Sequence, residues 1–268
     1  MTKNSSITLN KYIAHAGYCS RRAATEYIKK GKVCINGTVV LTPFSIVQTT
    51  DTVTVDNTTI IPEKKIYILL NKPKNVICTA SDENNRRTVT DLFLGVFKER
   101  LYPIGRLDRS TTGLIIMTND GDLTQRLSHP KYEVSKTYQV TSLNAITKKT
   151  LETLLAGVPL EDGFMKVDEA FYPTSSKKIA NVSIHSGKNH IVRRLFEELG
   201  HPDIKLDRFS YAGLTKNKLR SGEWRHLTPK EVEELYQSSK HEEIETEKKQ
   251  TIKKQNIKNK AKKYFARL

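Results

Sequence analysis

The sequence predicts an α+β fold with a small first domain and a larger second domain built on a mixed β-sheet. The first observation is size, since 268 residues, 37% of them hydrophobic, are enough for one good-sized packed domain and a smaller one. The second is the order of the predicted elements: the strands cluster without regular βαβ alternation, which favours a mixed sheet over a doubly wound one. The third is composition, which divides the chain into residues 7–62, 65–237 and 238–268.

In the first domain, local signals predict short helices and a β-hairpin. Ser20 is of a residue type that caps helix N-termini, and Gly17 and Gly31 follow apolar residues at helical spacing as stop signals. Asn36 and Gly37 between two apolar runs give the strongest short hairpin signal. The predicted elements are helices over 9–16 and 21–30, a hairpin over 32–40 and a strand over 51–57.

In the second domain, apolar runs predict strands and amphipathic patterns predict helices. Thr228 and Glu231 have the pattern of a capping box, with Pro229 at the first helical position, and so begin a last helix. Residues 61–65 are interpreted as a linker. The other predicted elements are strands over 66–73, 112–119, 136–143 and 179–187, and helices over 121–129, 146–157 and 189–200.

The charge of the chain predicts an anionic polymer as its partner. There are 45 Lys and Arg against 29 Asp and Glu, which gives a formal net charge of +16 and a pI near 9.6. Each phosphate that a basic residue neutralises releases condensed counterions, which favours nucleic acid. The C-terminal segment, residues 238–268, ends in KKQTIKKQNIKNKAKKYFARL, with nine basic residues and no acidic one. Such a segment is expected to be disordered in isolation, and either binds RNA or serves as a solubilising tail.

The remaining composition indicates a cytoplasmic protein without a metal. The N-terminus lacks the apolar core of a signal peptide, and no apolar run approaches the roughly 18 residues of a membrane span. Cys19, Cys34 and Cys78 are isolated, without a CxxC pair or histidines at metal-binding spacing. We therefore expect reduced cysteines, no membrane association and a cytoplasmic location.

The second predicted helix begins with two arginines. Arg21 and Arg22 directly follow the capping serine, where each cation opposes the helix dipole at a cost of roughly 0.3–1 kcal/mol. A phosphate bound at that end would offset the cost, because free N–H groups and guanidinium forks converge on it. The alternative is a solvated basic face. Further positive charge nearby comes from Lys11, Lys29, Lys30 and Lys32.

The order of elements around these arginines resembles a known RNA-binding domain. The stretch LNKYIAHAGYCSRRAATEYIKKGKVCINGTVV is similar to the S4 domain, in the pattern L-x-K, then S-R-R-x-A, then V-x-I-N-G. The resemblance covers about residues 7–60. It implies contacts with the RNA backbone by Arg21, Arg22, Lys11, Lys29 and Lys32.

One aspartate stands out in the turn PIGRLDRSTTG, which leads into a hydrophobic run. Asp108 lies between Arg106 and Arg109, so we expect these neighbouring charges to keep its carboxylate ionised. An ionised carboxylate can act as a nucleophile or stabilise a developing positive charge. The alternative is an ordinary surface ion pair, worth roughly 0–1 kcal/mol.

The whole stretch PIGRLDRSTTGLIIMTNDGDL resembles the catalytic signature of the RsuA/RluB-type ribosomal pseudouridine synthases. The similarity extends over nearly all of residues 7–236, including KIYILLNKPK, GVPLEDG, HSGKNHIVRRLFEELGH and GEWRHLT. It implies an S4 (αL-type) RNA-binding domain followed by a mixed, largely antiparallel pseudouridine synthase sheet with flanking helices. It also implies an isomerase that requires no cofactor.

The resemblance implies roles for residues at matching positions. Asp108 corresponds to the nucleophile, Tyr138 to the residue that stacks on the flipped uracil, and Arg193 to the arginine that pairs with the aspartate. Lys136 and Tyr138 alternate on a predicted strand and so face the same side. His190 stands where RsuA-type members usually have arginine. RNA contacts are implied for Arg106, Lys136, His190 and Arg194.

Two alternatives to this enzyme remain open. A catalytically silent S4-domain protein that assists ribosome assembly would share the first domain, but it would be expected to lose at least one of Asp108, Tyr138 and Arg193. A glycosidase would need a pair of carboxylates, whereas Asp120 and Asp122 are interpreted as turn and helix-start residues. Within the synthase family, the pattern favours 23S over 16S ribosomal RNA as substrate, an assembling ribosomal subunit as a further partner, and a monomer.

Overall fold

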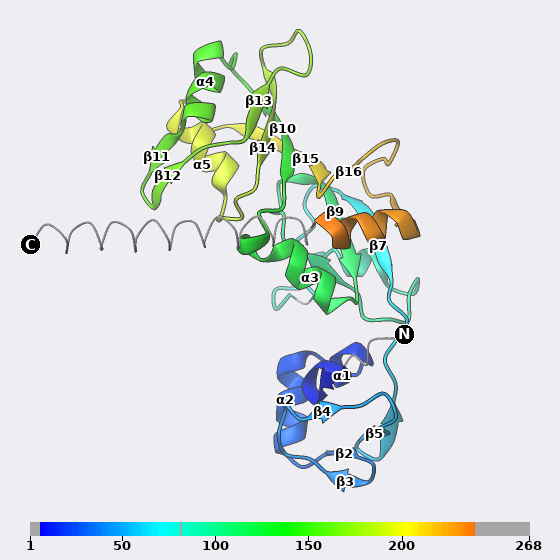
Figure 1. Cartoon of the computed structure of the whole chain (residues 1–268). Helices are drawn as coiled ribbons and strands as arrows, with labels where there is room; N and C mark the ends of the chain where they lie inside the picture. The colour runs from blue at the N-terminus through cyan, green and yellow to red at the C-terminus, as the bar shows by residue number, and fades with distance from the viewer. Residues whose placement is uncertain (1–5, 81, 239–268) are drawn as a thin grey trace, which may run out of the picture. The chain divides into compact units, whose positions relative to one another are not determined.

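The computed structural model of the protein describes residues 6–80 and 82–238. The basic segment expected at residues 238–268 lies outside them from residue 239 onward. The chain divides into two compact units (Figure 1). One is built mainly from residues up to Ile66, with the short segments Phe93–Leu101 and Thr118–Gly121, and the other contains most of the remaining chain. No helix within the described ranges is long and apolar enough to cross a membrane.

The first unit packs helices α1 (Leu9–His15) and α2 (Arg21–Lys29) against short strands. The Ala23 N–H donates to the Ser20 hydroxyl at 3.2 Å, so Ser20 caps α2 as the sequence predicted. Strands β3-β2-β5-β6 form one sheet and β1 pairs with β4. The strands are β1 (Ile7–Thr8), β2 (Val33–Ile35), β3 (Thr38–Val39), β4 (Ile46–Val47), β5 (Val53–Val55) and β6 (Thr58–Ile60). The core of this unit consists of Leu9, Ile13, Ala24, Ile28, Val33, Val47, Val53, Val55 and Ile60.

The second unit is built on a sheet with nine strands among the described residues. They are β7 (Tyr67–Lys72), β8 (Tyr102–Ile104), β9 (Thr112–Thr118), β10 (Lys136–Ser142), β13 (Glu169–Phe171), β14 (Ile179–Ile184), β15 (Ile204–Tyr211), β16 (Leu214–Thr215) and β17 (Trp224–His226). The order is β13-β14-β10-β15-β9-β7-β17, with β16 beside β15 and β8 beside β9. Strand β10 pairs antiparallel with β14 and β15, whereas β15 pairs parallel with β9, so the sheet is mixed and the α+β fold class is confirmed.

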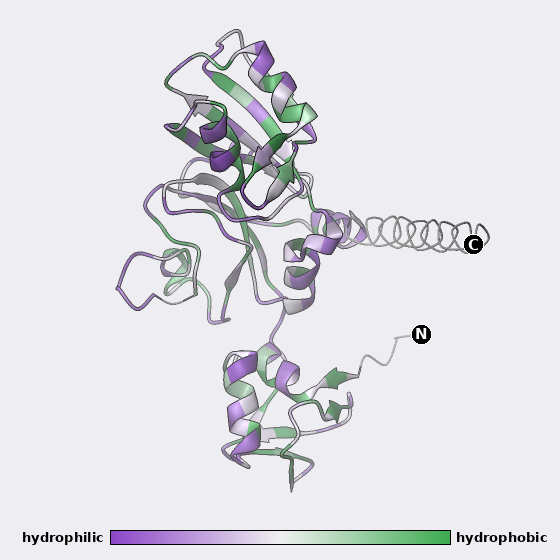
Figure 2. Ribbon diagram, turned by 90° about the vertical axis from the view of Figure 1, so that its left-hand side faces the viewer, coloured by the Kyte–Doolittle hydropathy of each residue, from purple (hydrophilic) through white to green (hydrophobic). Residues whose placement is uncertain are grey.

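Helices cover this sheet in two groups (Figure 1). The elements are α3 (Gly121–Ser128), α4 (Lys148–Ala156), α5 (Ile191–Glu198), a helix over 229–238, and the hairpin of β11 (Val158–Leu160) with β12 (Gly163–Met165). One apolar cluster joins α4 and α5 to β10 and β14, and another joins α3 and the last helix to β7 and β9. Hydrophobic residues are accordingly frequent along the strands, and hydrophilic residues are frequent on the helices (Figure 2).

The close approach of β9 to β15 requires a glycine. Gly113 has φ +114°, and a Cβ built there would lie 2.4 Å from the backbone N and O of Arg208. In the parallel register, Gly113 is opposite Arg208 and Thr112 opposite Asp207. The Thr112 hydroxyl donates to the Asp207 carboxylate at 2.7 Å, which ties the two strands at the same point. The loop that precedes β9 therefore has a fixed position.

The helices and strands that the sequence predicted all appear, within a few residues of their expected bounds. The capping box is confirmed: the Thr228 N–H donates to Glu231 Oε2 at 2.8 Å, and the Glu231 N–H donates to the Thr228 hydroxyl at 3.2 Å. The strands that were not predicted are β1, β4, β6, β8, β11, β12, β13, β15, β16 and β17. All of them except β15 have only two or three residues. Strand β15, IKLDRFSY, carries charged residues at both buried and exposed positions, so its pattern gives no clear strand signal.

Candidate active site

Asp108 lies in the tight loop between β8 and β9. The Thr111 N–H donates to the Asp108 carbonyl oxygen at 3.1 Å, which closes the turn. The Asn75 N–H donates to the carbonyl oxygen of Arg109 at 2.9 Å, which attaches the loop to the chain that follows β7. The Asp108 side chain remains 32% exposed. The aspartate is thus fixed through its backbone while its carboxylate stays accessible.

Arg193 of α5 holds one oxygen of the Asp108 carboxylate. Its Nε donates to Asp108 Oδ2 at 3.3 Å, and the Thr111 hydroxyl donates to the same oxygen at 3.3 Å. The guanidinium is itself fixed, because Nη1 donates to the Ile204 carbonyl at 3.0 Å and Nη2 donates to the hydroxyls of Ser110 and Thr111 at 3.0 and 3.1 Å. With all three nitrogens engaged, the arginine presents its charge to the carboxylate in one orientation.

The sequence offered two sources of positive charge for Asp108: its neighbours Arg106 and Arg109, and Arg193, which the family resemblance pairs with it. The Arg193 pairing is confirmed. Among the described residues, the ion pairs to Asp108 come from Arg193 and His190, both on or next to α5. Arg106 and Arg109 are exposed instead. In a tight turn, consecutive side chains point in different directions, so the compensating charge comes from the helix that packs over the loop.

The other carboxylate oxygen of Asp108 faces His190. The distance from His190 Nε2 to Asp108 Oδ1 is 3.2 Å, and the imidazole is 52% exposed. His190 is the N-cap residue of α5 and has the left-handed backbone conformation, with φ 50°. The sequence assigned His190 to RNA contact, and the structure places it against the predicted nucleophile.

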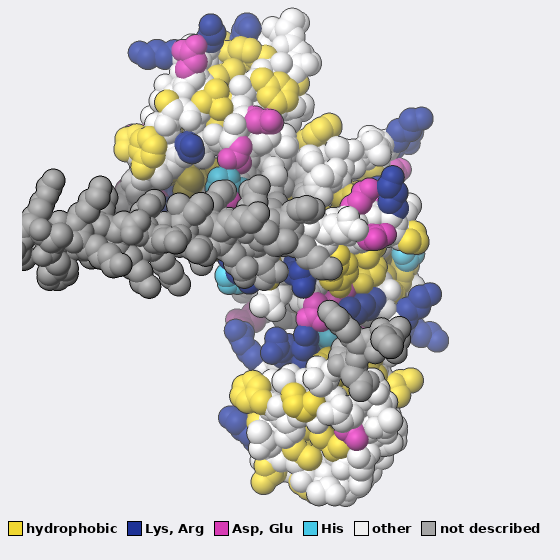
Figure 3. Space-filling model, in the orientation of Figure 1, with side chains coloured by type: hydrophobic (Ala, Val, Ile, Leu, Met, Phe, Trp, Pro, Cys, Tyr) yellow, Lys and Arg dark blue, Asp and Glu magenta, His cyan; other side chains and the backbone are white. Residues whose placement is uncertain are grey.

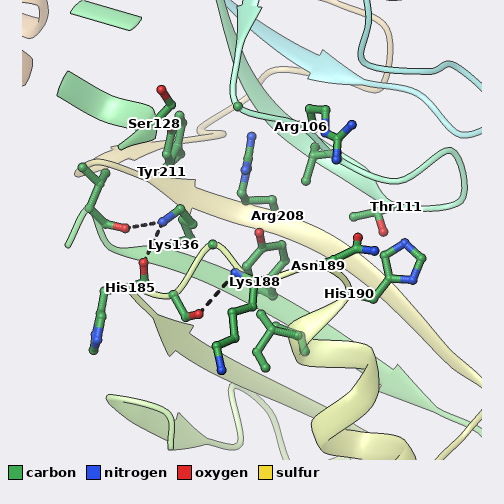
Figure 4. A pocket seen from close by; sticks show the side chains of 18 of the residues that line it. Arg106, Thr111, Ser128, Lys136, His185, Lys188, Asn189, His190, Arg208 and Tyr211 are labelled. Atoms are coloured by element: carbon green, nitrogen blue, oxygen red, sulfur yellow. Dashed lines mark hydrogen bonds between the residues drawn. The ribbon is translucent and has the colours of Figure 1, made fainter. Parts of the chain in front are cut away.

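A cavity of about 310 Å³ opens beside Asp108 (Figure 4). This volume lies at the lower end of the roughly 300–1,000 Å³ range of small-molecule sites. Strand β10 contributes Lys136 and Tyr138 to its lining, so both face the cavity as their spacing predicts. The Lys136 ammonium donates to the carbonyls of Val134 and His185 at 2.7 and 3.0 Å, which holds it against the cavity wall. In the described chain, no group of three or more His, Cys, Asp or Glu side chains could hold a metal ion.

Comparison with known proteins decides the family. Residues 66–198 match the RNA pseudouridylate synthase family, and residues 7–53 match the S4 domain. The ribosomal large subunit pseudouridine synthase B of Bacillus subtilis (strain 168) is 44% identical over 231 residues, which cover 85% of this chain and 94% of that protein. This chain belongs to the RNA pseudouridylate synthase family.

Other relatives agree with this membership. An uncharacterized RNA pseudouridine synthase of Aquifex aeolicus (strain VF5) is 34% identical over 236 residues, 87% of this chain and 94% of that protein. The crystal structure of a pseudouridylate synthase is 29% identical, with a TM-score of 0.61, and covers 86% of this chain and 100% of that one. The protein is therefore an isomerase with the pseudouridine synthase fold behind an S4 domain.

In this pseudouridine synthase, a buried lysine that the sequence did not single out lies close to the site. Lys72, at the end of β7, is 0% exposed, and its ammonium donates to the carbonyls of Pro73 and Val76 at 3.0 and 2.8 Å. Burial lowers the pKa of Lys72, and the charge of Asp108 is near enough to act in the opposite direction. The available signal was a lysine ending an otherwise apolar strand, YILLNK.

A second buried cation lines the cavity itself. Arg208 of β15 is 2% exposed, its Nε donates to the Leu114 carbonyl at 2.6 Å, and its guanidinium carbon lies 4.4 Å from the centre of the Tyr211 ring. Burial raises the pKa of Tyr211 to about 12, so this phenol stays neutral beside the guanidinium. Arg208 therefore places a buried guanidinium in the lining of the cavity.

The other residues assigned to RNA contact lie at the surface of their units. Arg106 is exposed and lines the cavity. Arg194 donates to both carboxylate oxygens of Asp162, at 3.2 and 2.5 Å, and so holds the pKa of Asp162 well below its usual range. In the first unit, Lys and Arg side chains are visible at the surface (Figure 3). Arg21, Arg22, Lys29 and Lys32 are exposed and Lys11 is half-buried.

Proposed function

We propose that this protein isomerises a specific uridine of large-subunit ribosomal RNA to pseudouridine, with Asp108 as the nucleophile. The observation that carries the proposal is the Asp108 carboxylate at the cavity wall, held on one oxygen by Arg193 and Thr111 and still 32% exposed. A carboxylate that is ionised, oriented and accessible has what attack on a sugar carbon requires. The cavity beside it has room for a small ligand of nucleoside size.

The reaction is a rearrangement with no net loss or gain of atoms. The bond from N1 of uracil to C1′ of the ribose breaks, the base turns, and a bond from C5 to C1′ forms. The C5 proton leaves and N1 gains a proton, so no oxidant, reductant or cofactor enters the balance. Asp108 attacks or stabilises the sugar at C1′ while the bond to the base is broken. Because a stacked base is out of reach, the target uridine must be flipped into the cavity.

The residues around Asp108 take supporting roles in this proposal. Tyr138 lines the cavity on β10, where its ring can stack on the uracil and its hydroxyl can assist proton transfer at C5. Arg106 is exposed at the mouth of the same cavity, in a position to fill the vacated stack or hold the RNA backbone. Lys136 supplies a fixed ammonium on the wall, and Arg194 contacts RNA from its place beside Asp162.

The substrate class rests on the relatives and on charge. The Bacillus subtilis relative is named a large-subunit synthase, which favours 23S over 16S ribosomal RNA, and Arg21, Arg22, Lys11, Lys29 and Lys32 of the S4 unit are proposed to bind its backbone. The net charge of +16 is suited to this partner. We place the protein in the cytoplasm, as a monomer that meets ribosomal RNA in the assembling subunit.

The test is tritium release from ribosomal RNA labelled at uridine C5, with wild-type protein and Asp108→Asn. Large-subunit and small-subunit transcripts are assayed separately, followed by assembly precursors. We expect release from the large-subunit RNA with wild type only, at least about a thousandfold slower in the variant, and RNA binding nearly unchanged. Tight binding of wild type without release from any RNA would instead indicate a catalytically silent assembly factor.

A further inference from the structure

The two oxygens of the Asp108 carboxylate have different surroundings. Oδ2 accepts hydrogen bonds from Arg193 and from the Thr111 hydroxyl, both at 3.3 Å. Oδ1 lies 3.2 Å from His190 Nε2. Figure 4 shows His190 and Thr111 close together at one end of the cavity. Both contact the Asp108 carboxylate, His190 from the start of α5 and Thr111 from the loop before β9. Both faces of the predicted nucleophile are therefore covered.

The groups that cover these two oxygens are held very differently. Arg193 is 23% exposed, and it also bonds to Ile204, Ser110 and Thr111, so it cannot leave without breaking a network. The His190 ring is 52% exposed, and its side chain makes no capping hydrogen bond to α5. Displacing the imidazole costs one exposed ion pair, whereas displacing Arg193 costs four hydrogen bonds. The oxygen that a substrate can uncover is Oδ1.

We propose that His190 is a gate on the nucleophile. In the free enzyme its ring shields Asp108 Oδ1; when the target uridine enters the cavity, the ring leaves Oδ1 and contacts an RNA phosphate beside that nucleotide. This inference deepens the proposed function and rests on it. Asp108 Oδ1 is then the oxygen that meets the sugar, while Oδ2 stays with Arg193 and Thr111.

A phosphate is the acceptor that the charges on this loop favour. An imidazole N–H that leaves a carboxylate needs another hydrogen-bond acceptor, and a flipped nucleotide brings a phosphate on each side of it. The neighbouring cation Lys188 is already engaged, since its ammonium lies 3.2 Å from Asp162 and donates to the Asp162 carbonyl at 3.0 Å. Arg194 is bound to the same Asp162 carboxylate. Of these three side chains, His190 is the one that does not contact Asp162.

The exchange gives the gate a function in selectivity. While no nucleotide is bound, the imidazole lies against the reactive oxygen and reduces its access to other electrophiles. Only a ligand that fills the cavity and carries a backbone phosphate offers His190 a replacement contact. A free base or nucleoside lacks that phosphate and would open the gate less readily.

The test uses His190→Asn and His190→Arg in the full chain. Asparagine is among the residues that tolerate the left-handed φ of 50° at this position, so it removes the imidazole ring without new backbone strain. Arginine retains a cation that can contact both a carboxylate and a phosphate. Thermal unfolding of both variants checks that they fold.

The first measurement needs neither RNA nor turnover. The free proteins are labelled with a water-soluble carbodiimide and an amine, and modification of Asp108 is followed by peptide mass spectrometry, with Asp56 as an internal reference. We expect labelling of Asp108 to rise about threefold to fivefold in His190→Asn, as for loss of one exposed ion pair, and to stay near wild type in His190→Arg. Unchanged labelling of Asp108 in His190→Asn would contradict the proposal that the His190 ring shields this carboxylate.

The second measurement separates the gate from a direct part in catalysis. With target RNA, we expect His190→Asn to raise Kd about fivefold and to slow the single-turnover rate at saturating RNA by less than about threefold. The slope of log Kd against log salt concentration should become less steep by about 0.7, as for the loss of one phosphate contact to a single strand. His190→Arg should restore the affinity. A large loss of the single-turnover rate at unchanged affinity would overturn the proposal, because His190 would then act on Asp108 in the bound state. Absence of turnover by wild type on every RNA would count against the proposed function. The labelling result would still show whether His190 shields Asp108 in the free protein.

Discussion

At the scale of single residues, the site depends on how one carboxylate is held. Asp108 combines a backbone fixed by the turn to Thr111 with a side chain bound by Arg193, whose other nitrogens reach Ile204, Ser110 and Thr111. The guanidinium is planar and offers five donors in a fixed geometry, which a lysine ammonium cannot reproduce. The charge alone is therefore not sufficient to orient the nucleophile.

We expect Arg193→Lys to slow the single-turnover rate about 10-fold to 100-fold, since orientation of a catalytic group within about 1 Å carries effects of this size. RNA affinity should change little, because Arg193 is directed to the protein. The matched control is Arg194→Lys, the next residue on α5, which retains a cation for Asp162 and should slow the chemical step much less. Equal rates for the two variants would show that the network around Asp108 does not orient it.

At the scale of elements, the loop that carries the proposed nucleophile depends on the contact between β9 and β15. Gly113→Ala would place a Cβ 2.4 Å from backbone atoms of Arg208, at a φ of +114° that side chains rarely adopt. Backbone cannot give way as a side-chain tip can, so we expect a loss of about 2–4 kcal/mol in the free energy of unfolding and a large loss of turnover. Urea denaturation measures the first effect.

A second glycine separates the effect of the close contact with Arg208 from the effect of the positive φ. Gly95 also has a positive φ, +76°, but no atom lies within 4 Å of a Cβ built there. Gly95→Ala should therefore cost about 1 kcal/mol, from the backbone conformation alone. If both variants lost the same stability, the close approach of the strands would not be the reason for glycine at position 113.

The last helix carries an ion pair whose contribution depends on pH. The hydrogen bonds from Arg225, at 2.6 and 2.8 Å, lower the pKa of Glu231 from 4.5 to about 2. A folded-state pKa below the unfolded value stabilises the fold above pH 4.5, and this stabilisation is lost as pH falls toward 2. An unscreened shift of that size would be worth about 3 kcal/mol; since water reaches the pair, we expect about 1 kcal/mol.

Glu231→Gln tests this contribution, because glutamine can still form the capping box with Thr228. The variant should be about 1 kcal/mol less stable than wild type in urea denaturation at pH 7. The difference should shrink when both proteins are measured at pH 3.5 and below. A difference that does not depend on pH would assign the effect to packing or capping rather than to charge.

At the scale of the whole molecule, the arginines proposed to bind RNA in the S4 domain and the proposed nucleophile belong to different units. The S4 unit carries exposed Arg21 and Arg22 at the start of α2, while Asp108 and its cavity lie in the synthase unit. We expect Arg21→Ala combined with Arg22→Ala to weaken RNA binding about 10-fold at moderate salt and to lower the salt dependence by between about 1 and 2. Single-turnover rates at saturating RNA should change little. A rate that fell as much as the affinity would show that the S4 arginines also act on the reacting nucleotide.

The sequence predicted the helix caps, the strand alternation and the family because each of these depends on residues close together along the chain. Ser20 caps α2 and Thr228 caps the last helix through bonds within three residues, and the alternation of Lys136 and Tyr138 places both on the cavity side of β10. The signature around Asp108 also identified the family, which the relatives bear out. Each of these features depends on residues that are neighbours along the chain.

Tertiary structure decided what surrounds the nucleophile. The sequence placed Arg106 and Arg109 beside Asp108, but the charges that contact its carboxylate come from Arg193, 85 residues later, and from His190. Packing of α5 over the loop before β9 determines this, and packing also buries Lys72 under the site. An electrostatic environment is set by distance in space and by burial, and neither is a property of sequence separation. The sequence by itself therefore determined which carboxylate to examine and, through the family resemblance, named Arg193 as its partner. Only the fold determined the bonds that fix Arg193 and the position of His190 against the second oxygen.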